Sequence, residues 1–500
     1  MRDRLLSLAE RVRVEATNGL DPAAQSARGQ YFTPDKTAAL IAGLPSLPHA
    51  DVLRILDPGA GSGMLSAAIV ERVCADGRAA AIDLTVVEAD ASLLPALHQT
   101  ARLCRQWGCD HGVAVGVRVV AGDFVLMQTG LDAELGFNYD LVIMNPPYQK
   151  LGSASWQRKV LESSGWRVTN LYAAFLAVGV DSLRHGGQLV AITPRSFANG
   201  PYFGQFRRRL LAEVAFNRLH TFESRSTVFA DTGVLQENVV FSATKGGHRD
   251  SVVITSSHGP TDEVAARSVG YGELVSPTDR QQFIRISVDE TSEEAVRVLE
   301  ALPASLAALG LKVSTGKVVD FRARQNLRDT PRPGCLPLVY PGNLRQGEVQ
   351  WPRPIGKAQA FGLLKESDSK ALLPSGYYVL VKRFSAKEER RRIVAAVWDP
   401  TRHEDQPVAF ENHLNVFHKK GVGLDRELAW GLCLWLNSTV VDRYFRTFSG
   451  HTQVNATDLR SLNYPDAPTL RRLGQGADRL PEQDALDQLV EEMTREPVAA

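Results

Sequence analysis

The chain has 500 residues, of which 44% are hydrophobic and 23% charged, with a formal net charge of +1. This composition is typical of a globular protein with at least two domains, and no apolar stretch reaches the length of a membrane span. Five cysteines without zinc-ligand spacing argue against a structural metal site and favour a reducing cytoplasm.

Short apolar runs alternate with helical patterns through the first 200 residues. Helical patterns occupy residues 64–73 and 169–187. Strand-like runs occupy residues 51–57, 81–90, 116–123, 139–147 and 188–194. This alternation predicts an α/β, Rossmann-like domain with a mainly parallel sheet covered by helices.

The alternation of strands and helices fades after about residue 250. Residues 312–360 are rich in Pro, Gly and Arg and contain only short strand-like pieces, which favours an α+β second domain. We expect four regions: a first domain over 1–245, a boundary or linker over 246–300, a second domain over 301–470 and an acidic tail over 471–500.

A glycine-rich turn, residues 57–63, ends the first predicted strand and precedes a helix. Glycines let the backbone pass close to a ligand, and Glu88 and Asp123 end the next two strands. Glu88 can accept both hydroxyls of a ribose, and Asp123 can accept a hydrogen bond from an adenine amino group. Each acid alone would be interpreted as a cap or turn former, but together they lie where α/β sheets bind ligands. The predicted cofactor-binding residues of this region are Asp57, Gly59, Ala60, Gly61, Gly63, Glu88, Asp123 and Phe124.

The tetrapeptide Asn145-Pro146-Pro147-Tyr148 follows the fourth predicted strand. An exocyclic amine is a poor nucleophile because its lone pair is delocalised into the ring. Acceptors at the Asn145 side-chain oxygen and the Pro146 carbonyl would free that lone pair for attack on a sulfonium methyl group. The prolines form a rigid turn, and Tyr148 offers a face for stacking an extruded base. An ordinary proline-rich turn is the alternative, which the position and the companion motifs disfavour.

These motifs resemble the γ class of N6-adenine DNA methyltransferases. Residues 29–34, Gly-Gln-Tyr-Phe-Thr-Pro, look like the N-terminal motif of that class, in which Thr33 would reach the methionine end of the cofactor. The order of this motif, the glycine loop and the tetrapeptide is that of the class. The resemblance implies S-adenosyl-L-methionine as the cofactor. It also implies that Phe241, at the end of residues 226–241, stacks on the flipped adenine, although an apolar strand residue is more often part of a core.

The C-terminal half also resembles Type II restriction–modification methyltransferases, of the XhoI and PstI kind. The resemblance lies in residues 314–326, 339–343 and 448–460. It implies a site-specific DNA (adenine-N6)-methyltransferase that acts on a flipped-out adenine in double-stranded DNA and protects prokaryotic host DNA from a separate restriction endonuclease. It further implies a monomer without membrane or metal partners.

Two clusters in the second half carry the residue types that read base edges in the major groove. In residues 312–345, seven basic residues stand against two acidic ones, whereas residues 466–500 hold four basic and eight acidic ones. Arg390, Arg391 and Arg392 would touch phosphates or merely solvent. The predicted DNA-binding residues are Arg322, Arg324, Gln325, Asn326 and Arg328, beside Phe321, and the alternating His451, Gln453 and Asn455.

Three other functions compete with this interpretation. The tetrapeptide also activates adenine in RNA enzymes and the glutamine side-chain amide in protein methyltransferases, but those need only a short accessory region. A non-catalytic DNA-specificity subunit is disfavoured by the complete set of Asp57, Glu88, Asp123 and Asn145. A fused restriction enzyme is disfavoured because some 28 residues precede the first motif and no nuclease carboxylate–lysine pattern follows.

Overall fold

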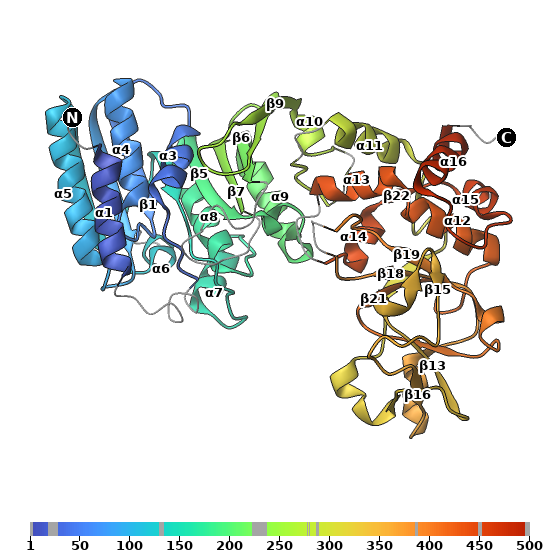
Figure 1. Cartoon of the computed structure of the whole chain (residues 1–500). Helices are drawn as coiled ribbons and strands as arrows, with labels where there is room; N and C mark the ends of the chain where they lie inside the picture. The colour runs from blue at the N-terminus through green and yellow to red at the C-terminus, as the bar shows by residue number, and fades with distance from the viewer. Residues whose placement is uncertain are drawn as a thin grey trace. The chain divides into compact units, whose positions relative to one another are not determined.

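The chain folds into two compact units, Met1–Val288 and Asp289–Ala500, which are described separately (Figure 1). The computed structural model describes residues 4–18, 29–129, 135–222, 238–277, 279, 281–286, 290–385, 389–448 and 453–495.

Unit 1 is built on a nine-stranded sheet with the order β3-β2-β1-β4-β5-β7-β6-β8-β9. The five strands from β3 to β5 pair in parallel, whereas β7 runs antiparallel to both β5 and β6. The predicted α/β, mainly parallel sheet is therefore confirmed. The strands are β1 (Ala50–Pro58), β2 (Ala79–Glu88), β3 (Ala114–Ala121), β4 (Tyr139–Met144), β5 (Leu183–Pro194), β6 (Val214–Phe222), β7 (Asn238–Lys245), β8 (Ser251–Ser257) and β9 (Ala265–Gly270).

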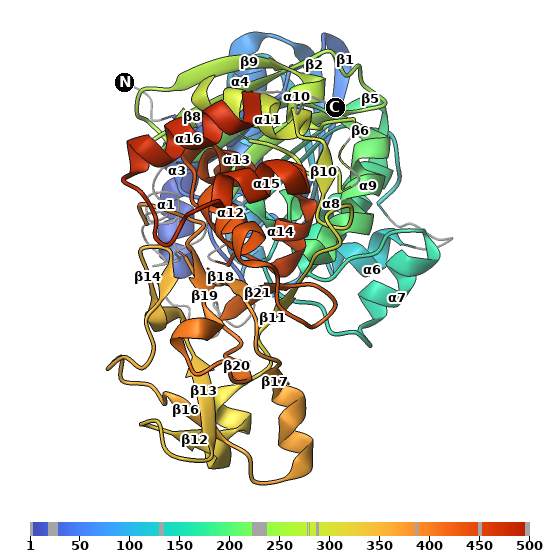
Figure 2. The ribbon, with the colours of Figure 1, turned by 90° about the vertical axis from the view of Figure 1, so that its right-hand side faces the viewer.

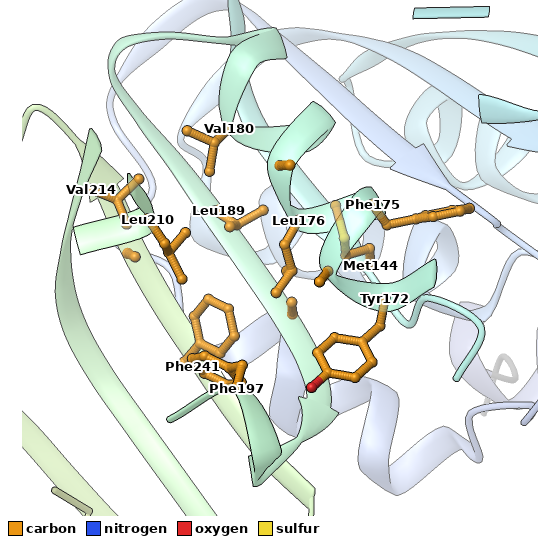
Figure 3. Packing of buried hydrophobic residues seen from close by; sticks show 14 of the residues in the cluster. Met144, Tyr172, Phe175, Leu176, Val180, Leu189, Phe197, Leu210, Val214 and Phe241 are labelled. Atoms are coloured by element: carbon orange, nitrogen blue, oxygen red, sulfur yellow. The ribbon is translucent and has the colours of Figure 1, made fainter. Parts of the chain in front are cut away.

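Helices cover both faces of this sheet because alternate side chains of each buried strand point to opposite faces. In β4, Leu141 and Ile143 join one hydrophobic cluster and Val142 and Met144 the other. The first cluster contains residues of α1 (Leu5–Thr17), α3 (Asp35–Gly43), α4 (Met64–Asp76) and α5 (Leu94–Asp110). The second, drawn in part in Figure 3, contains residues of α6 (Phe124–Gln128), α7 (Trp156–Ser163), α8 (Leu171–Ser182) and α9 (Gly204–Glu213).

Residues 251–270 belong to the sheet of unit 1, within the range where a linker was expected. Strand β8 pairs in parallel with β6, and β9 pairs antiparallel with β8. The helical α11 (Glu290–Ala301) then begins unit 2. The alternation of strands and helices fades before the sheet ends because these last strands follow one another without an intervening helix.

Unit 2 combines helices with a two-stranded, a five-stranded and a six-stranded sheet, which confirms the expected α+β class. Figure 2 shows α12, α15 and α16 at one end of this unit and the five-stranded sheet at the other. The six-stranded sheet has the order β11-β21-β18-β19-β15-β14 and the five-stranded sheet β12-β16-β13-β20-β17. Its strands are β10 (Ala304–Ser305), β11 (Lys312–Thr315), β12 (Leu327–Arg328), β13 (Cys335–Val339), β14 (Leu344–Arg345), β15 (Glu348–Val349), β16 (Ala360–Gly362), β17 (Leu372–Leu373), β18 (Tyr378–Lys382), β19 (Ala395–Trp398), β20 (Val408–Phe410), β21 (Leu414–His418) and β22 (Asn463–Tyr464).

Within the region expected as an acidic tail, the described residues include the end of one helix and a second helix. Helix α16 (Gln483–Arg495) is amphipathic: it buries Leu486 and Val490 and exposes most of its acidic residues, whereas Asp487 accepts from the Thr439 N–H at 2.6 Å at the start of α13. The other helices of unit 2 are α12 (Arg426–Leu436), α13 (Thr439–Phe448), α14 (Ala456–Ser461) and α15 (Ala467–Gly474). Among the described residues, no helix is long and apolar enough to cross a membrane.

Candidate active site

A pocket of about 500 Å³ lies at the carboxyl ends of the central strands of unit 1. The chain passes from β1 outward to β2 and β3 and then returns to β4 on the other side of β1. Parallel sheets bind ligands at such a switch point because the loops that follow neighbouring strands diverge there. Most of the predicted cofactor and catalytic residues line this pocket, namely Thr33, Asp57, Gly59, Ala60, Gly61, Glu88, Asp123, Phe124, Asn145 and Pro147.

The glycine loop presents a buried carboxyl group to the pocket. Gly59 and Gly61 have φ of 69° and 58°, a left-handed conformation that favours glycine. Asp57 accepts a hydrogen bond from the Ser66 hydroxyl at 2.6 Å through Oδ2, and burial raises the pKa of Asp57 to about 7. Its Oδ1 is buried and has no hydrogen-bond partner among the described residues. This oxygen is suited to a donor or cation supplied by a ligand.

Glu88 joins the glycine loop to the end of β2. Its two carboxylate oxygens accept from the backbone N–H of Gly61 at 2.7 Å and from that of Asp90 at 2.8 Å. Burial raises the pKa of Glu88 above its usual value. Each oxygen retains a lone pair, so the carboxylate can still accept the hydroxyl groups of a ligand.

Asp123 both lines the pocket and caps a helix. Its Oδ1 accepts from the Leu126 N–H at 3.1 Å at the start of α6, and its Oδ2 accepts from Gln157 Nε2 at 3.0 Å. The neighbouring Phe124 is almost fully buried, with its ring centroid 5.2 Å from that of Phe175. The interpretations of Asp123 as a cap and as a pocket residue are therefore compatible.

The side chain of Asn145 is held in one orientation by the N-terminal motif. Its Nδ2 donates to the Tyr31 carbonyl at 2.7 Å and to Thr33 Oγ1 at 3.0 Å. Because a backbone carbonyl can only accept, the amide nitrogen must face Tyr31, and Oδ1 must face the other way. Tyr148 donates its hydroxyl to this Oδ1 at 3.3 Å. Asn145 therefore presents an oriented acceptor beside the pocket.

Close backbone contact joins the N-terminal motif to the tetrapeptide. The Tyr148 N–H donates to the Gly29 carbonyl at 3.1 Å, and a Cβ on Gly29 would lie 2.9 Å from the Tyr148 nitrogen. The rings of Tyr31 and Tyr148 lie 5.3 Å apart. Burial raises the pKa of Tyr148 well above its usual value, so the phenol stays protonated and can donate.

Some pocket residues were missed from the sequence. Tyr31 could have been found from its place two residues before Thr33, and Asp90 from its place two residues beyond β2. Phe175 carried no such signal because its position in α8 fits an ordinary apolar helix. Gln30 and Phe32 also line the pocket.

Other predicted residues lie away from the pocket lining. Gly63, with φ of 89°, precedes α4, and a Cβ there would lie 2.9 Å from Thr100 of α5, so Gly63 serves helix packing. Pro146 and Tyr148 adjoin the pocket without lining it. Residues 226–237 lie outside the described residues.

Phe241 belongs to the core of unit 1, which differs from its expected role in base stacking. It is fully buried in β7, and its ring lies 5.6 Å from that of Phe197 (Figure 3). The ring of Phe216 lies 5.3 Å from it. The apolar pattern of β7 is explained by this packing, because every residue from Asn238 to Ala243 is buried.

The first predicted DNA-binding cluster divides into exposed and structural residues. Arg322, Arg324 and Gln325 are exposed on two consecutive 3-10 turns. Asn326 instead donates from Nδ2 to the carbonyl of Gly362 at 2.8 Å and to the Asp368 carboxylate at 2.7 Å. Arg328 donates to the nearby carbonyls of Gln325 and Leu327.

The second cluster is described only in part, since His451 lies outside the described residues. Gln453 and Asn455 are half-buried on either side of the buried Val454. Asn455 also begins α14, with its backbone N–H donating to Asp458 at 2.9 Å.

Arg392 corrects the expectation that residues 390–392 contact phosphates or merely solvent. Its side chain is fully buried and donates from Nε to Ser385, while its backbone N–H donates to Asp442. Arg391 donates to the Asn437 carbonyl. No group of three or more His, Cys, Asp or Glu residues that could hold a metal ion occurs among the described residues.

The sheet order and the pocket at its switch point define the class, which is that of α/β proteins that bind a ligand at the carboxyl ends of a mainly parallel sheet. The family model "Eco57I restriction-modification methylase" matches residues 126–229. The Type II methyltransferase M.PstI of Providencia stuartii is 38% identical over 94% of this chain and 93% of its own length. M.BsuBI of Bacillus subtilis, also a Type II methyltransferase, is 41% identical over 90% of each chain. The chain therefore belongs to this family of Type II methyltransferases.

The solved structure of the Type IIL restriction-modification enzyme MmeI in complex with DNA has a similar fold. Its TM-score is 0.55 at 12% identity, covering 99% of this chain and 75% of that one. A DrdV–DNA complex gives a TM-score of 0.51 at 11% identity, covering 94% and 59%. At these identities the likeness concerns the fold alone.

Proposed function

We propose that the protein is a site-specific DNA (adenine-N6)-methyltransferase that uses S-adenosyl-L-methionine. The observation that carries this proposal is the acceptor Oδ1 of Asn145, which is oriented by the two hydrogen bonds from Nδ2 at the edge of the pocket. Membership of a Type II methyltransferase family supports DNA of a restriction–modification system as the substrate.

The residues of the pocket fit S-adenosylmethionine. The cofactor is cationic at its methionine end, which suits the unpartnered Oδ1 of Asp57. Glu88 has lone pairs for the ribose hydroxyls, and Asp123 can accept from the adenine amino group. The left-handed Gly59 and Gly61 leave room for close approach of a ligand. When bound, S-adenosylmethionine supplies an electrophilic methyl group.

The protein would activate the target amine by accepting hydrogen bonds from its two N–H groups. Asn145 Oδ1 and the Pro146 carbonyl would accept these hydrogens and draw the nitrogen lone pair out of the ring. Thr33 and the Tyr31 carbonyl would keep Asn145 from turning its amide nitrogen toward the substrate. The ring of Tyr148 would stack on the extruded base, which offsets part of the few kcal/mol lost on leaving the duplex.

Recognition of the DNA sequence is assigned to unit 2. Its exposed Arg322, Arg324 and Gln325 have the side chains that pair with base edges, and Gln453 could join them. A separate restriction endonuclease would cut the same sequence when it is unmethylated.

Product analysis would test this proposal. Purified protein should transfer labelled methyl groups from S-adenosylmethionine to adenine-containing duplexes, and digestion of the DNA should yield N6-methyladenine. Structured RNA and glutamine-containing proteins serve as parallel substrates. Label in RNA or in protein alone would overturn the DNA assignment, and N4-methylcytosine as the product would overturn the assignment to adenine.

A further inference from the structure

A shallow hollow of about 340 Å³ lies on unit 1 outside the cofactor pocket. It is formed by α7, the segment 167–169, the start of α9 and the 3-10 turn Pro201–Phe203. We call it the arginine hollow after the residues that dominate it, which are Arg158, Arg167, Thr169, Tyr202, Gln205 and Arg208.

The arginine hollow carries positive charge that the residues described by the structure neutralise only in part. Arg167 and Arg208 are exposed and form no ion pair with any other described residue. Arg158 shares its charge with Glu162, at 3.2 Å. A guanidinium group without a carboxylate partner presents a fork of N–H donors that matches the oxygen atoms of a phosphate.

An aromatic side chain stands free at the edge of the hollow. Tyr202 is 80% exposed, whereas the adjacent Phe203 is 7% exposed. The ring of Phe203 packs against Tyr172, with centroids 5.7 Å apart. Tyr202 therefore contributes little to the core, and its phenol can donate to a ligand on the surface.

The hollow adjoins the catalytic tetrapeptide. Thr169, which lines it, accepts at its carbonyl from the Leu151 N–H at 3.1 Å, three residues beyond Tyr148. On the other side, the ring of Tyr172 meets Tyr148 edge-on with centroids 6.2 Å apart. Helix α7 is tied to the cofactor pocket through the hydrogen bond from Gln157 to Asp123.

We infer that the arginine hollow binds phosphates of the DNA strand next to the extruded adenine. This inference rests on the proposed function and adds a DNA contact on the catalytic unit itself. A base that reaches Asn145 brings its flanking phosphates to the same edge of unit 1, where Arg167 and Arg208 would neutralise them. Phosphate contacts carry no sequence information, so this surface would position the strand while recognition residues elsewhere select the site.

Salt dependence of DNA binding by the full-length protein would test the inference. Duplex DNA would be titrated into Arg167→Gln, Arg208→Gln and the double variant, at salt concentrations between about 50 and about 200 mM. Each substitution should lower the slope of log affinity against log salt by about 0.9, and the double variant should bind roughly 10- to 100-fold more weakly. The loss should be equal for duplexes of any sequence.

Arg102→Gln is the matched control, because Arg102 is an exposed arginine on α5, which packs against β3 at the far edge of the sheet. It removes the same charge and should leave the slope unchanged. S-adenosylmethionine binding and the melting temperature should be unaltered in all variants, which establishes that they are folded. If wild-type protein binds DNA and the double variant keeps both its slope and its affinity, the inference is wrong. If wild-type protein methylates no DNA, the proposed function itself fails.

Discussion

The sequence predicted the position of polar residues better at the strand ends of unit 1 than in the 3-10 turns of unit 2. At the strand ends, Asp57, Glu88 and Asn145 all reach one pocket. In the turns, the predicted DNA-binding residues have different environments. Arg322 is exposed, whereas Asn326 donates a hydrogen bond to the backbone carbonyl of Gly362.

The difference follows from how each region is supported. Parallel strands place their carboxyl ends along one edge of the sheet, so a polar residue at a strand end is expected to lie at that edge. Short strands and 3-10 turns have many unpaired backbone groups, and nearby Asn and Arg side chains satisfy them. Polar residues in irregular regions therefore have competing structural uses. Substitutions in both regions should separate functional side chains from structural ones.

Replacing Asn145 should have the largest effect. Asn145→Ala removes the proposed acceptor for the target amine and should lower methyl transfer by roughly 10²- to 10³-fold or more. Cofactor binding should survive, since the role proposed for Asn145 is to act on the amine. Calorimetric titration with S-adenosylmethionine and single-turnover methylation would separate the two effects. Loss of cofactor binding in a folded variant would assign Asn145 to the cofactor site instead.

Removing the Glu88 carboxylate should weaken cofactor binding by about 1.5–3 kcal/mol, because the proposed charged acceptor for the ribose hydroxyls is lost. Glu88→Ala also frees the backbone N–H groups of Gly61 and Asp90. Glu88→Gln is the matched variant, which keeps an oxygen acceptor and should lose less. An unchanged dissociation constant in Glu88→Ala would show that the end of β2 does not contact the cofactor.

Cofactor affinity should fall roughly tenfold as the pH drops from about 7.5 to about 6. Burial raises the pKa of Asp57 to about 7, so the free protein takes up a proton there over this range and loses an anionic acceptor. The folded state holds this proton more tightly than the unfolded chain, so ionisation of Asp57 opposes folding increasingly as pH rises from about 4 to about 7. Asp57→Asn should bind the cofactor more weakly and lose most of this pH dependence, and Glu88, whose pKa is also raised by burial, accounts for what remains. A wild-type profile in that variant would contradict the role of Asp57.

Thr33→Val should lower kcat by about 5- to 30-fold, the equivalent of about 1–2 kcal/mol. Valine keeps the shape of Thr33 but cannot accept from Asn145 Nδ2, so the amide nitrogen loses one of its two hydrogen bonds and keeps the one to the Tyr31 carbonyl. Thr33→Ser retains the hydroxyl and should restore most of kcat. If Thr33→Val weakens only S-adenosylmethionine binding, the hydroxyl acts on the cofactor and does not orient Asn145.

The smallest effects are expected in unit 2, where replacing Asn326 should lower stability and replacing Arg322 should lower DNA affinity. Asn326→Ala should cost about 1–2 kcal/mol of stability, because the Gly362 carbonyl and Asp368 lose a donor. Arg322→Ala should leave the melting temperature unchanged and weaken DNA binding severalfold. Thermal unfolding and DNA titration of both variants would check this. The reverse assignment would show that exposure does not distinguish DNA contacts here.

Much of the fold of unit 1 could be predicted because each buried strand reads as an apolar run. The exceptions are β6 and the region from 251 to 270, which were not predicted as strands. Strands β7, β8 and β9 follow one another without helices between them. The buried Arg392 in unit 2 shows a different limit. Three consecutive arginines are typical of a surface, but Arg392 packs over the ring of Phe445 and against Ser385. Phe445 is distant in sequence and belongs to α13, so a local pattern does not indicate its contact with Arg392.

The sequence by itself determined which chemical groups stand at the strand ends of unit 1, because strand periodicity and a breaking turn are local properties. Only the tertiary structure decided how those groups are oriented. Thr33 and Asn145 are 112 residues apart, and their hydrogen bond exists because Gly29 lets two backbone segments approach closely. The placement of the arginines in the hollow depends likewise on the packing of α7 and α9 against α8. Such approaches depend on how whole elements pack, which no local pattern encodes.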